Sequence, residues 1–225
     1  MIPLKTGHKS KKIKRGFPFV NILFILICIG VFVYEIYLSN ISPVKVEDLF
    51  YTYGVIPDLF LKKIRFIDCW MILYPYITSV FLHGGWLHII GNMLFLAIFG
   101  GDVERSMGHI KYFFFFILCG IASGLFHTFM NIHSSVPTVG ASGAIAGVLG
   151  AYFIWFPKAK ITTIIPLIFV TPIIEIPAII FLGAWFLFQF LSGTGAGPQD
   201  HVAWWAHIGG FVIGIFFALT FFKKK

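Results

Sequence analysis

Six apolar runs follow one another along almost the whole chain of 225 residues. A hydrocarbon layer of about 30 Å is crossed by roughly 20 apolar residues in a helix, so such runs predict membrane-spanning helices. Charged residues make up only 12% of the chain, whereas an average soluble domain carries about 25%. The sequence therefore predicts one membrane-embedded unit and leaves no room for a sizeable soluble domain. The predicted spans are 17–38, 86–101, 112–130, 141–156, 164–191 and 204–222.

Positive charge is concentrated at the two ends of the chain. Residues 1–16 contain six Lys or Arg residues, and residues 223–225 are three lysines. Six spans place both ends on one side of the membrane, and the loops 102–111 and 157–163 reach the same side. That side then holds thirteen of the seventeen Lys and Arg residues. Because basic residues are enriched in cytoplasmic loops, both termini are expected in the cytoplasm.

The predicted architecture is an all-α membrane protein, a six-transmembrane-helix bundle over 17–222. A basic cytoplasmic tail (1–16) precedes it, and a basic cytoplasmic C-terminus (223–225) follows it. Basic runs can also bind nucleic acid, but beside apolar spans they are typical of topology signals, so no nucleic-acid partner is expected. We expect a multi-pass protein of the plasma membrane that contacts the lipid bilayer. The oligomeric state stays open.

The segment 39–85, between the first two spans, is long and rich in aromatic residues. Unstructured loops of this length are uncommon. Trp and Tyr side chains favour the boundary between lipid and water. Part of this segment is therefore expected to lie in the membrane interface as amphipathic or irregular structure.

Several polar residues within the predicted spans fall at one depth, although polar side chains are costly in hydrocarbon. His88 and Asn92 lie one turn apart on one face of the second span. Ser142 lies at the start of the fourth span, and His207 lies near the start of the sixth. These three spans run in the same direction, so all four residues lie within roughly 10 Å of the outer helix ends. One cavity that opens to the outside can contain them.

Glycines accompany the serine and the histidine at one-turn spacing. Small residues allow two membrane helices to approach closely. Such an approach can bring the Ser142 hydroxyl within hydrogen-bond reach of the His207 ring, which activation of a serine requires. A helix N-terminus at Ser142 also presents free N–H groups that suit an oxyanion. The glycines are Gly143 and Gly147 in the fourth span, and Gly210 and Gly214 in the sixth.

The same residues allow other interpretations. Each polar residue alone also fits a structural role, because a serine among glycines packs and a membrane histidine bonds a neighbouring carbonyl. A metal site would use His83, His88 and His207, but the chain lacks a His-Glu-x-x-His helix, so no metal or other cofactor is expected. Glu35 and Glu175 are the acidic residues of the predicted apolar spans, and they would suit a transporter.

Three short motifs hold the polar residues and glycines together. They are His83-Gly-Gly-Trp-Leu-His88-Ile-Ile-Gly-Asn92, followed by Phe99-Gly-Gly-Asp-Val-Glu104; Gly140-Ala-Ser142-Gly143; and Ala206-His207-Ile-Gly-Gly210-Phe-Val-Ile-Gly214. In this order and on these spans, they resemble the motifs of the rhomboid family of intramembrane serine proteases. The likeness covers about residues 70–220.

The resemblance implies a catalytic dyad and an oxyanion hole. Ser142 would be the nucleophile, and His207 would be the general base that accepts its proton. His88 and Asn92, together with the backbone N–H of Ser142, would stabilise the tetrahedral oxyanion. Family members work with this dyad and need no third, acidic residue.

The resemblance also implies supporting roles. His83 matches a histidine with a structural hydrogen-bonding role, and Glu104 matches a glutamate that braces helices at their cytoplasmic ends. Many members carry Trp-Arg nine residues before the first histidine, where this chain has Tyr74-Pro75. That departure concerns the first loop and its lipid contacts rather than the catalytic set. The glycines expected to support the site are Gly140, Gly143, Gly210 and Gly214.

The expected function is that of an intramembrane serine endopeptidase that cleaves transmembrane segments of membrane-protein substrates. A peptide bond inside a helix is protected by the helix's hydrogen bonds, so substrate helices that unwind easily are expected. Two alternatives stay open: a catalytically inactive rhomboid-like protein that binds membrane proteins, and a small transporter.

Overall fold

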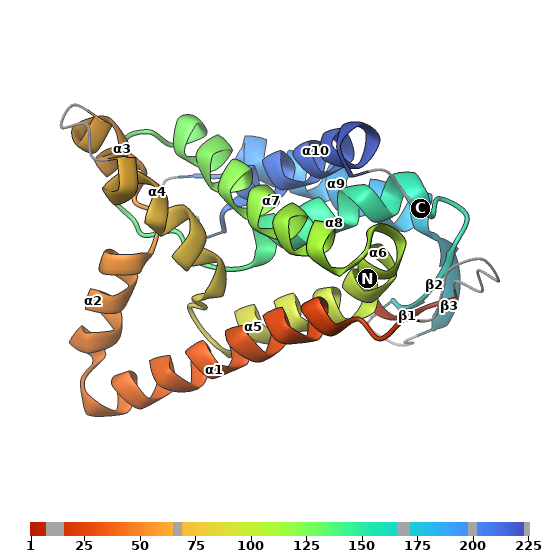
Figure 1. Ribbon diagram of the computed structural model, residues 1–225, viewed down its shortest axis with the longest axis horizontal. Coiled ribbons are helices and arrows are strands. Elements are labelled where there is room, and N and C mark those ends of the chain that lie inside the picture. The colour runs from red at the N-terminus through yellow and green to blue at the C-terminus, as the bar shows by residue number, and fades with distance from the viewer. Residues whose placement is uncertain (8–15, 65–68, 166–171, 198–201, 223–225) are drawn as a thin grey trace.

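A computed structural model describes residues 1–7, 16–64, 69–165, 172–197 and 202–222. Most of these residues form helices that pack lengthwise in a bundle, and three short strands lie at one end of it (Figure 1). The basic residues of 8–15 and 223–225, Arg65, and the part of the predicted fifth span at 166–171 lie outside the described residues.

Each of the six apolar runs contains a helix, so the predicted helical membrane bundle is confirmed. Within the described part of these six runs, four helices are long and apolar enough to cross a membrane, and two are shorter, with 14 and 17 residues. The count of six crossings therefore stays a prediction. The four longer ones are α1 (Phe19–Ile41), the continuous helix Trp86–Met107, α7 (His109–Met130) and α9 (Ala178–Gly195). The shorter ones are α8 (Ser142–Trp155) and α10 (Trp204–Thr220).

The helix Trp86–Met107 consists of three consecutive pieces. They are α5 (Trp86–Phe95), a π-helical turn η2 (Leu96–Gly100) and α6 (Gly101–Met107). A π-helical turn loosens the regular hydrogen-bond ladder. Here the carbonyl of Leu96 accepts a hydrogen bond of 3.1 Å from the side-chain amide of Asn21 in α1. The turn therefore ties this helix to α1.

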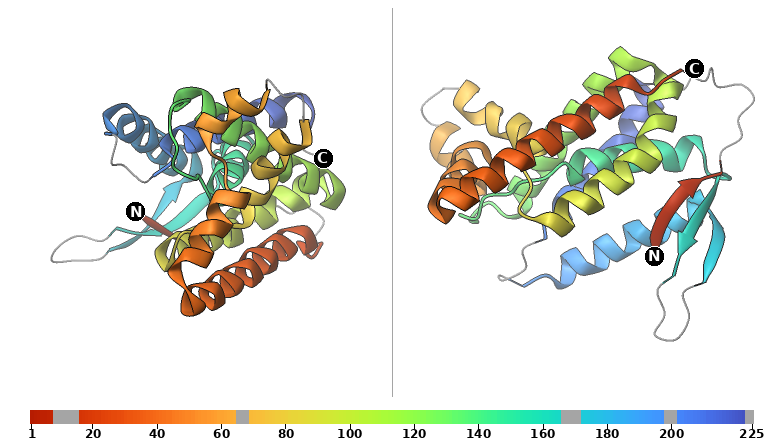
Figure 2. Two further views of the ribbon diagram at one scale, coloured as in Figure 1. Left: turned by 90° about the vertical axis from the view of Figure 1, so that its left-hand side faces the viewer. Right: turned by 90° about the horizontal axis from the view of Figure 1, so that it is seen from below.

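The expectation of an all-α fold is corrected by a small antiparallel sheet. Its strands, in the order β1-β2-β3, are β1 (Ile2–Thr6), β2 (Lys160–Ile164) and β3 (Ile173–Pro177). β1 belongs to the segment predicted as a basic tail, and it pairs with β2. The Thr6 hydroxyl also donates a hydrogen bond of 2.9 Å to Asp102 in α6. Figure 2 shows the sheet beside one end of the bundle.

The predicted start of the fifth span at residue 164 is wrong. The chain forms β2 and β3 there, and α9 begins only at Ala178, after Pro177. Prolines lack the N–H that a helix interior needs, which is why the helix starts after the last of them. Glu175 therefore lies in β3 and not in a membrane helix. In the sheet, Lys160 donates a hydrogen bond of 2.9 Å to its carboxylate. This hydrogen bond and charge hold the pKa of Glu175 below its usual value.

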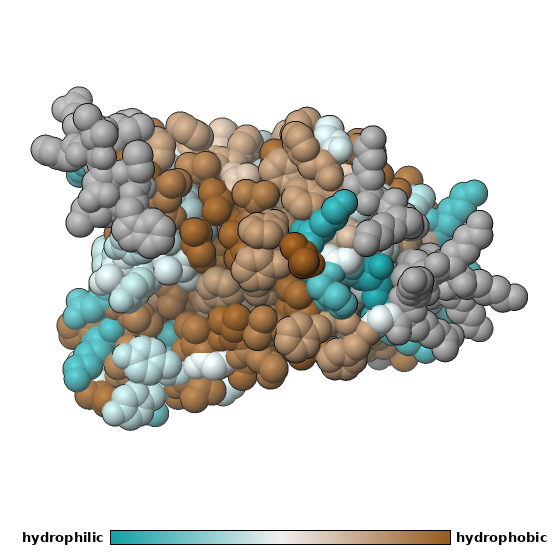
Figure 3. All heavy atoms as spheres, in the orientation of Figure 1, coloured by the Kyte–Doolittle hydropathy of each residue, from teal (hydrophilic) through white to brown (hydrophobic). Residues whose placement is uncertain are grey.

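The segment 39–85 is largely helical. It forms α2 (Pro43–Tyr53), α3 (Pro57–Ile64), α4 (Cys69–Thr78) and a short 3₁₀ turn, η1 (Ser79–Phe81). These helices lie at the end of the bundle opposite the sheet (Figure 1). On the face shown in Figure 3, apolar surface spans the middle of the molecule, and hydrophilic residues gather toward its two ends. This distribution fits a bundle whose middle faces lipid.

Glu104 closes the N-terminus of α1. It is fully buried, and its two carboxylate oxygens accept the N–H groups of Val20 and Asn21 at 3.0 and 2.7 Å. The first turn of a helix has N–H groups without helical partners, and its dipole favours negative charge. His109 lies against the same carboxylate, at 2.5 Å from Oε1. Glu104 thus joins the starts of α1 and α7 to α6.

Replacing Glu104 by alanine is expected to destabilise the bundle by about 1–3 kcal/mol, because two buried N–H groups lose their acceptor. The midpoint of thermal unfolding in detergent would measure the loss. Glu47→Ala, at an exposed position of α2, is the control and should leave the midpoint near the native value. Equal midpoints for both variants would contradict the capping role.

Candidate active site

Helix α8 is the innermost helix of the bundle. Every residue from Gly143 to Tyr152 is buried, whereas α1, α7 and α9 each leave large apolar side chains exposed. A helix that is apolar all round and buried on every face is surrounded by other helices. Ser142, its first residue, is only half-buried. The serine therefore lies where the innermost helix opens toward the surface.

Glycines bring α8 and α10 into backbone contact. A Cβ atom added to Gly210 would lie 3.0 Å from the carbonyl carbon of Gly143, and one added to Gly214 would lie 2.5 Å from the Cα of Gly147. Gly210 meets Gly143, and one turn later in both helices Gly214 meets Gly147, so α8 and α10 run parallel. Any side chain at these positions would push the helices apart, which is the physical reason for the glycines.

The same contact places Ser142 and His207 at one level. Ser142 directly precedes Gly143, and His207 directly follows Ala206. A Cβ atom added to Gly143 would lie 3.6 Å from the carbonyl oxygen of Ala206, so the neighbours of the two residues touch. No hydrogen bond joins the two side chains among the residues that the structure describes. Serine–histidine hydrogen bonds are often long without substrate and tighten when it binds.

His88 and Asn92 flank the turn that precedes Ser142. Gly140 has a φ of +125°, a conformation that side chains disfavour, and its N–H donates to the carbonyl of Ser79 at 2.8 Å. A Cβ atom at Gly140 would lie 2.6 Å from Nε2 of His88 and 3.7 Å from Nδ2 of Asn92. Glycine is therefore required here both for its backbone conformation and for space.

Two kinds of hydrogen-bond donor remain unused near this turn. Nδ2 of Asn92 is buried and has no partner among the described residues. No side chain caps the N-terminus of α8, where the first N–H groups lack helical acceptors. A buried donor without a partner is costly, so such groups point to a ligand or a reacting atom. An oxyanion beside Ser142 would accept hydrogen bonds from both the Asn92 amide and the N–H groups at the start of α8.

His83 is held beside His88 by the backbone and by α1. Its N–H donates to Oε1 of Glu35 at 3.0 Å, and its ring Nδ1 lies 3.2 Å from the carbonyl of Phe81. The ring centroids of His83 and His88 are 5.3 Å apart. Burial lowers the pKa of His83 to about 4, so the ring is neutral near pH 7. Glu35, considered above for transport, thus contacts the loop before α5.

Gln189 in α9 was not predicted as a site residue. Its side-chain oxygen lies 2.7 Å from Nδ1 of His207, and the residue is 4% exposed. The signal was present in the sequence, because Gln189 is a polar residue in an apolar span, near the outer end of that span. The same criterion applied to the fifth span would have selected it.

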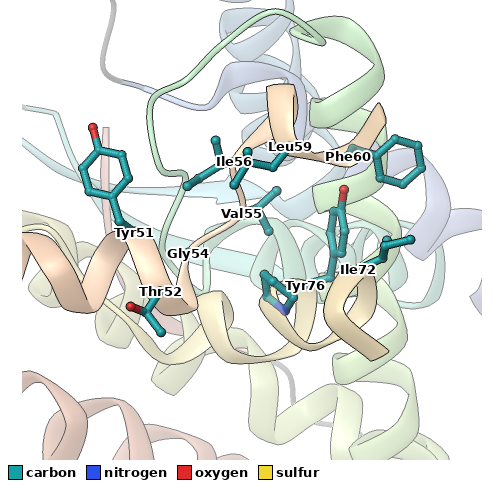
Figure 4. A pocket seen from close by; sticks show the side chains of 10 residues that line it. Tyr51, Thr52, Gly54, Val55, Ile56, Leu59, Phe60, Ile72 and Tyr76 are labelled. Carbon is teal, nitrogen blue, oxygen red and sulfur yellow. The ribbon is translucent and has the colours of Figure 1, made fainter. Parts of the chain in front are cut away.

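The pocket in Figure 4 lies away from these residues. It is formed by α2, α3, α4 and the turn between the first two of them. Its lining is mainly aliphatic and aromatic, and neither Ser142 nor His207 contributes to it. In the part of the chain that the structure describes, no three His, Cys, Asp or Glu residues form a group that could hold a metal ion.

Comparison with known proteins identifies the family of the chain. A family model described as the rhomboid domain matches residues 71–224, which include all four residues of the predicted dyad and oxyanion hole. The chain belongs to the rhomboid family. Its apolar helices and this family membership make it an integral membrane protein.

A bacterial and a yeast rhomboid are among the relatives that match most of the chain. It is 27% identical to Rhomboid protease AarA of Providencia stuartii over an alignment of 230 positions, which covers 95% of the chain and 76% of that protein. It is 31% identical to Rhomboid protein 1, mitochondrial, of Saccharomyces cerevisiae over 172 residues, 68% of the chain and 45% of that protein. The chain spans about half the length of three plant and yeast relatives that it matches, 40% to 54% of each.

A relative described as inactive also matches. Inactive rhomboid protein 1 of Drosophila melanogaster is 31% identical over 86 residues, which cover 37% of the chain and 6% of that protein. Family membership alone therefore does not decide whether a rhomboid chain is catalytic. The residues of the site must carry that conclusion.

Proposed function

We propose that this rhomboid protein is an intramembrane serine endopeptidase that cleaves transmembrane segments of other membrane proteins. The observation that carries the proposal is the contact of α8 with α10, where Gly143 meets Ala206 beside Ser142 and His207. The relative named as a protease, similar over 95% of this chain, supports the same reading.

The proposed reaction is acyl transfer through the serine. Nε2 of His207 accepts the hydroxyl proton as Ser142 Oγ attacks the carbonyl carbon of the scissile bond. The tetrahedral intermediate collapses, the C–N bond breaks, and the imidazolium gives its proton to the leaving amine. The same ring then takes a proton from a water molecule as the water oxygen attacks the acyl carbon, the C–Oγ bond breaks, and the imidazolium returns a proton to Ser142 Oγ.

The proposed oxyanion hole combines backbone and side-chain donors. The N–H of Ser142 is at the free N-terminus of α8, and the amide of Asn92 is a buried donor without a partner in the described structure. His88 lies beside the same turn. Donors held in place before the reaction stabilise developing charge without reorganisation. Stabilisation of this type requires no metal or cofactor.

The proposed orientation places the sheet end of the bundle in the cytoplasm. Lys5, Arg105 and Lys160 lie at this end, since β1 pairs with β2 and contacts Asp102. Basic residues favour the cytoplasmic side. The site then opens toward the outer face, and the plasma membrane is the proposed location. Water for hydrolysis would enter from that face.

Labelling with a fluorophosphonate probe in detergent tests the proposal. Native protein is expected to be labelled, and His207→Ala at least about 100-fold more slowly, because a general base contributes this much to serine reactivity. His133→Ala, a histidine in the loop after α7, is the control and should react like the native protein. Equal labelling of native protein and His207→Ala, or no labelling of either, would refute the dyad and favour a binding protein.

A further inference from the structure

Gln189 and His207 face one another inside the bundle. Between Ala178 and Leu191, Gln189 is the one residue of α9 with a side chain that both donates and accepts hydrogen bonds. Its Oε1 lies 2.7 Å from Nδ1 of the His207 ring. An amide placed in an apolar helix is costly unless its groups are paired. The contact with His207 supplies that pairing.

The direction of this hydrogen bond follows from the other end of the amide. A flip of an amide side chain exchanges its NH₂ donor and its C=O acceptor, so the surrounding groups decide which orientation is assigned. Here Nε2 of Gln189 donates to the backbone carbonyl of Trp185 at 3.4 Å. A flipped amide would turn its oxygen toward that carbonyl, and two acceptors would face each other. Oε1 therefore faces the imidazole.

An amide oxygen only accepts hydrogen bonds, so Nδ1 of His207 must carry the hydrogen. In the neutral ring, Nε2 is then the nitrogen with the free lone pair. That tautomer can take a proton from a serine hydroxyl. The opposite tautomer would present an N–H to Ser142 and leave two acceptors, Nδ1 and Oε1, in contact.

The surroundings also restrict rotation of the ring. The centroid of the His207 ring lies 6.1 Å from that of Trp185 and 6.1 Å from that of Trp204, with interplanar angles of 34° and 86°. Trp185 thus contributes its ring to His207 and its carbonyl to Gln189. One turn of α9 therefore carries both Trp185, which lies near the imidazole, and Gln189, which bonds it.

We propose that Gln189 is a positioning residue for the reaction: by accepting the hydrogen bond of His207 Nδ1–H, it keeps the Nε2 lone pair available to Ser142. This inference rests on the proposed function. It gives a neutral amide the place that an acidic residue holds in a serine triad. Gln189 acts through His207 and has no proposed contact with substrate.

Two variants separate this role from simple packing. Gln189→Leu replaces the acceptor by an apolar side chain of similar size, and it is expected to lower kcat by about 10–100-fold with little change in KM. Gln189→Glu keeps an oxygen that accepts from Nδ1–H, and it should restore kcat to within a few-fold of native. Thr194→Val is the control on the same helix, since this hydroxyl bonds only carbonyls of α9.

The tautomer itself can be measured by ¹⁵N NMR of histidine-labelled protein in detergent, with the His207 signal assigned from His207→Ala. Native protein and Gln189→Glu should show hydrogen on Nδ1, and Gln189→Leu should lose this preference. A native ring with hydrogen on Nε2, or a Leu variant with native kcat and native tautomer, would overturn the proposal. A Gln189-dependent tautomer in a protein without Ser142-dependent cleavage would refute the proposed function and leave the Gln189–His207 hydrogen bond standing.

Discussion

Ser142→Ala is expected to reduce cleavage of a transmembrane substrate by on the order of 10⁶, to below detection, as loss of the nucleophile does in serine proteases. The bundle should remain intact, because alanine fits wherever serine does and no side-chain hydrogen bond of Ser142 is recorded among the described residues. Cleavage in proteoliposomes, followed on a gel, measures the first effect. The midpoint of thermal unfolding measures the second.

The matched control is Ser106→Ala, in α6. Ser106 is buried, and among the described residues its hydroxyl bonds only the carbonyl of Asp102 in its own helix, at 2.8 Å. This variant should cleave like the native protein. If Ser142→Ala kept its cellular role without any cleavage, the protein would be a binder. If it kept solute flux into proteoliposomes, the transporter alternative would gain support.

Gly214→Val is expected to destabilise the bundle by about 3 kcal/mol or more and to abolish cleavage with it. The added Cβ would lie 2.5 Å from the Cα and 2.7 Å from the carbonyl carbon of Gly147. These are backbone atoms, so only separation of α8 from α10 can relieve the clash. Such a separation would also move Ser142 away from His207. Thermal unfolding and substrate cleavage, measured on one preparation, test both effects.

Gly30→Ala in α1 is the control for this substitution. A Cβ atom at Gly30 would meet nothing within 4 Å. The change is expected to be neutral or to stabilise the helix by up to about 1 kcal/mol, because alanine favours helix more than glycine does. A Gly214→Val protein with native stability and native cleavage would show that the close approach of the two helices is not needed.

The helices of the membrane bundle could be predicted because one property, a long apolar run, is enough to mark them. The level shared by Ser142 and His207 could also be predicted, because both residues lie near the starts of spans that run in the same direction. Glycines at one-turn spacing predicted that the two helices approach closely. The structure has this contact at Gly143 and Gly210. The catalytic roles of the two residues remain predictions until the variants are measured.

The sheet could not be read from the sequence. β1 and β2 are separated by more than 150 residues, so their pairing is a tertiary contact without a local signal. Three prolines lie in the first half of the predicted fifth span, and such a pattern cannot distinguish a late or kinked helix from a strand hairpin. The partner of His207 was missed for a different reason. Gln189 has no catalytic chemistry of its own, and only the packing of α9 on α10 brings it to the ring.

An experimental structure with a phosphonate inhibitor bound would give the decisive measurement. We expect the phosphorus to be bonded to Ser142 Oγ, with Nε2 of His207 within about 3 Å of that oxygen. The phosphoryl oxygen should point toward the Ser142 N–H, Asn92 Nδ2 and the His88 ring, and Gln189 should accept from Nδ1 of His207. A phosphonate on another residue, or a His207 ring turned away from Ser142, would contradict a serine–histidine dyad at the contact of α8 with α10.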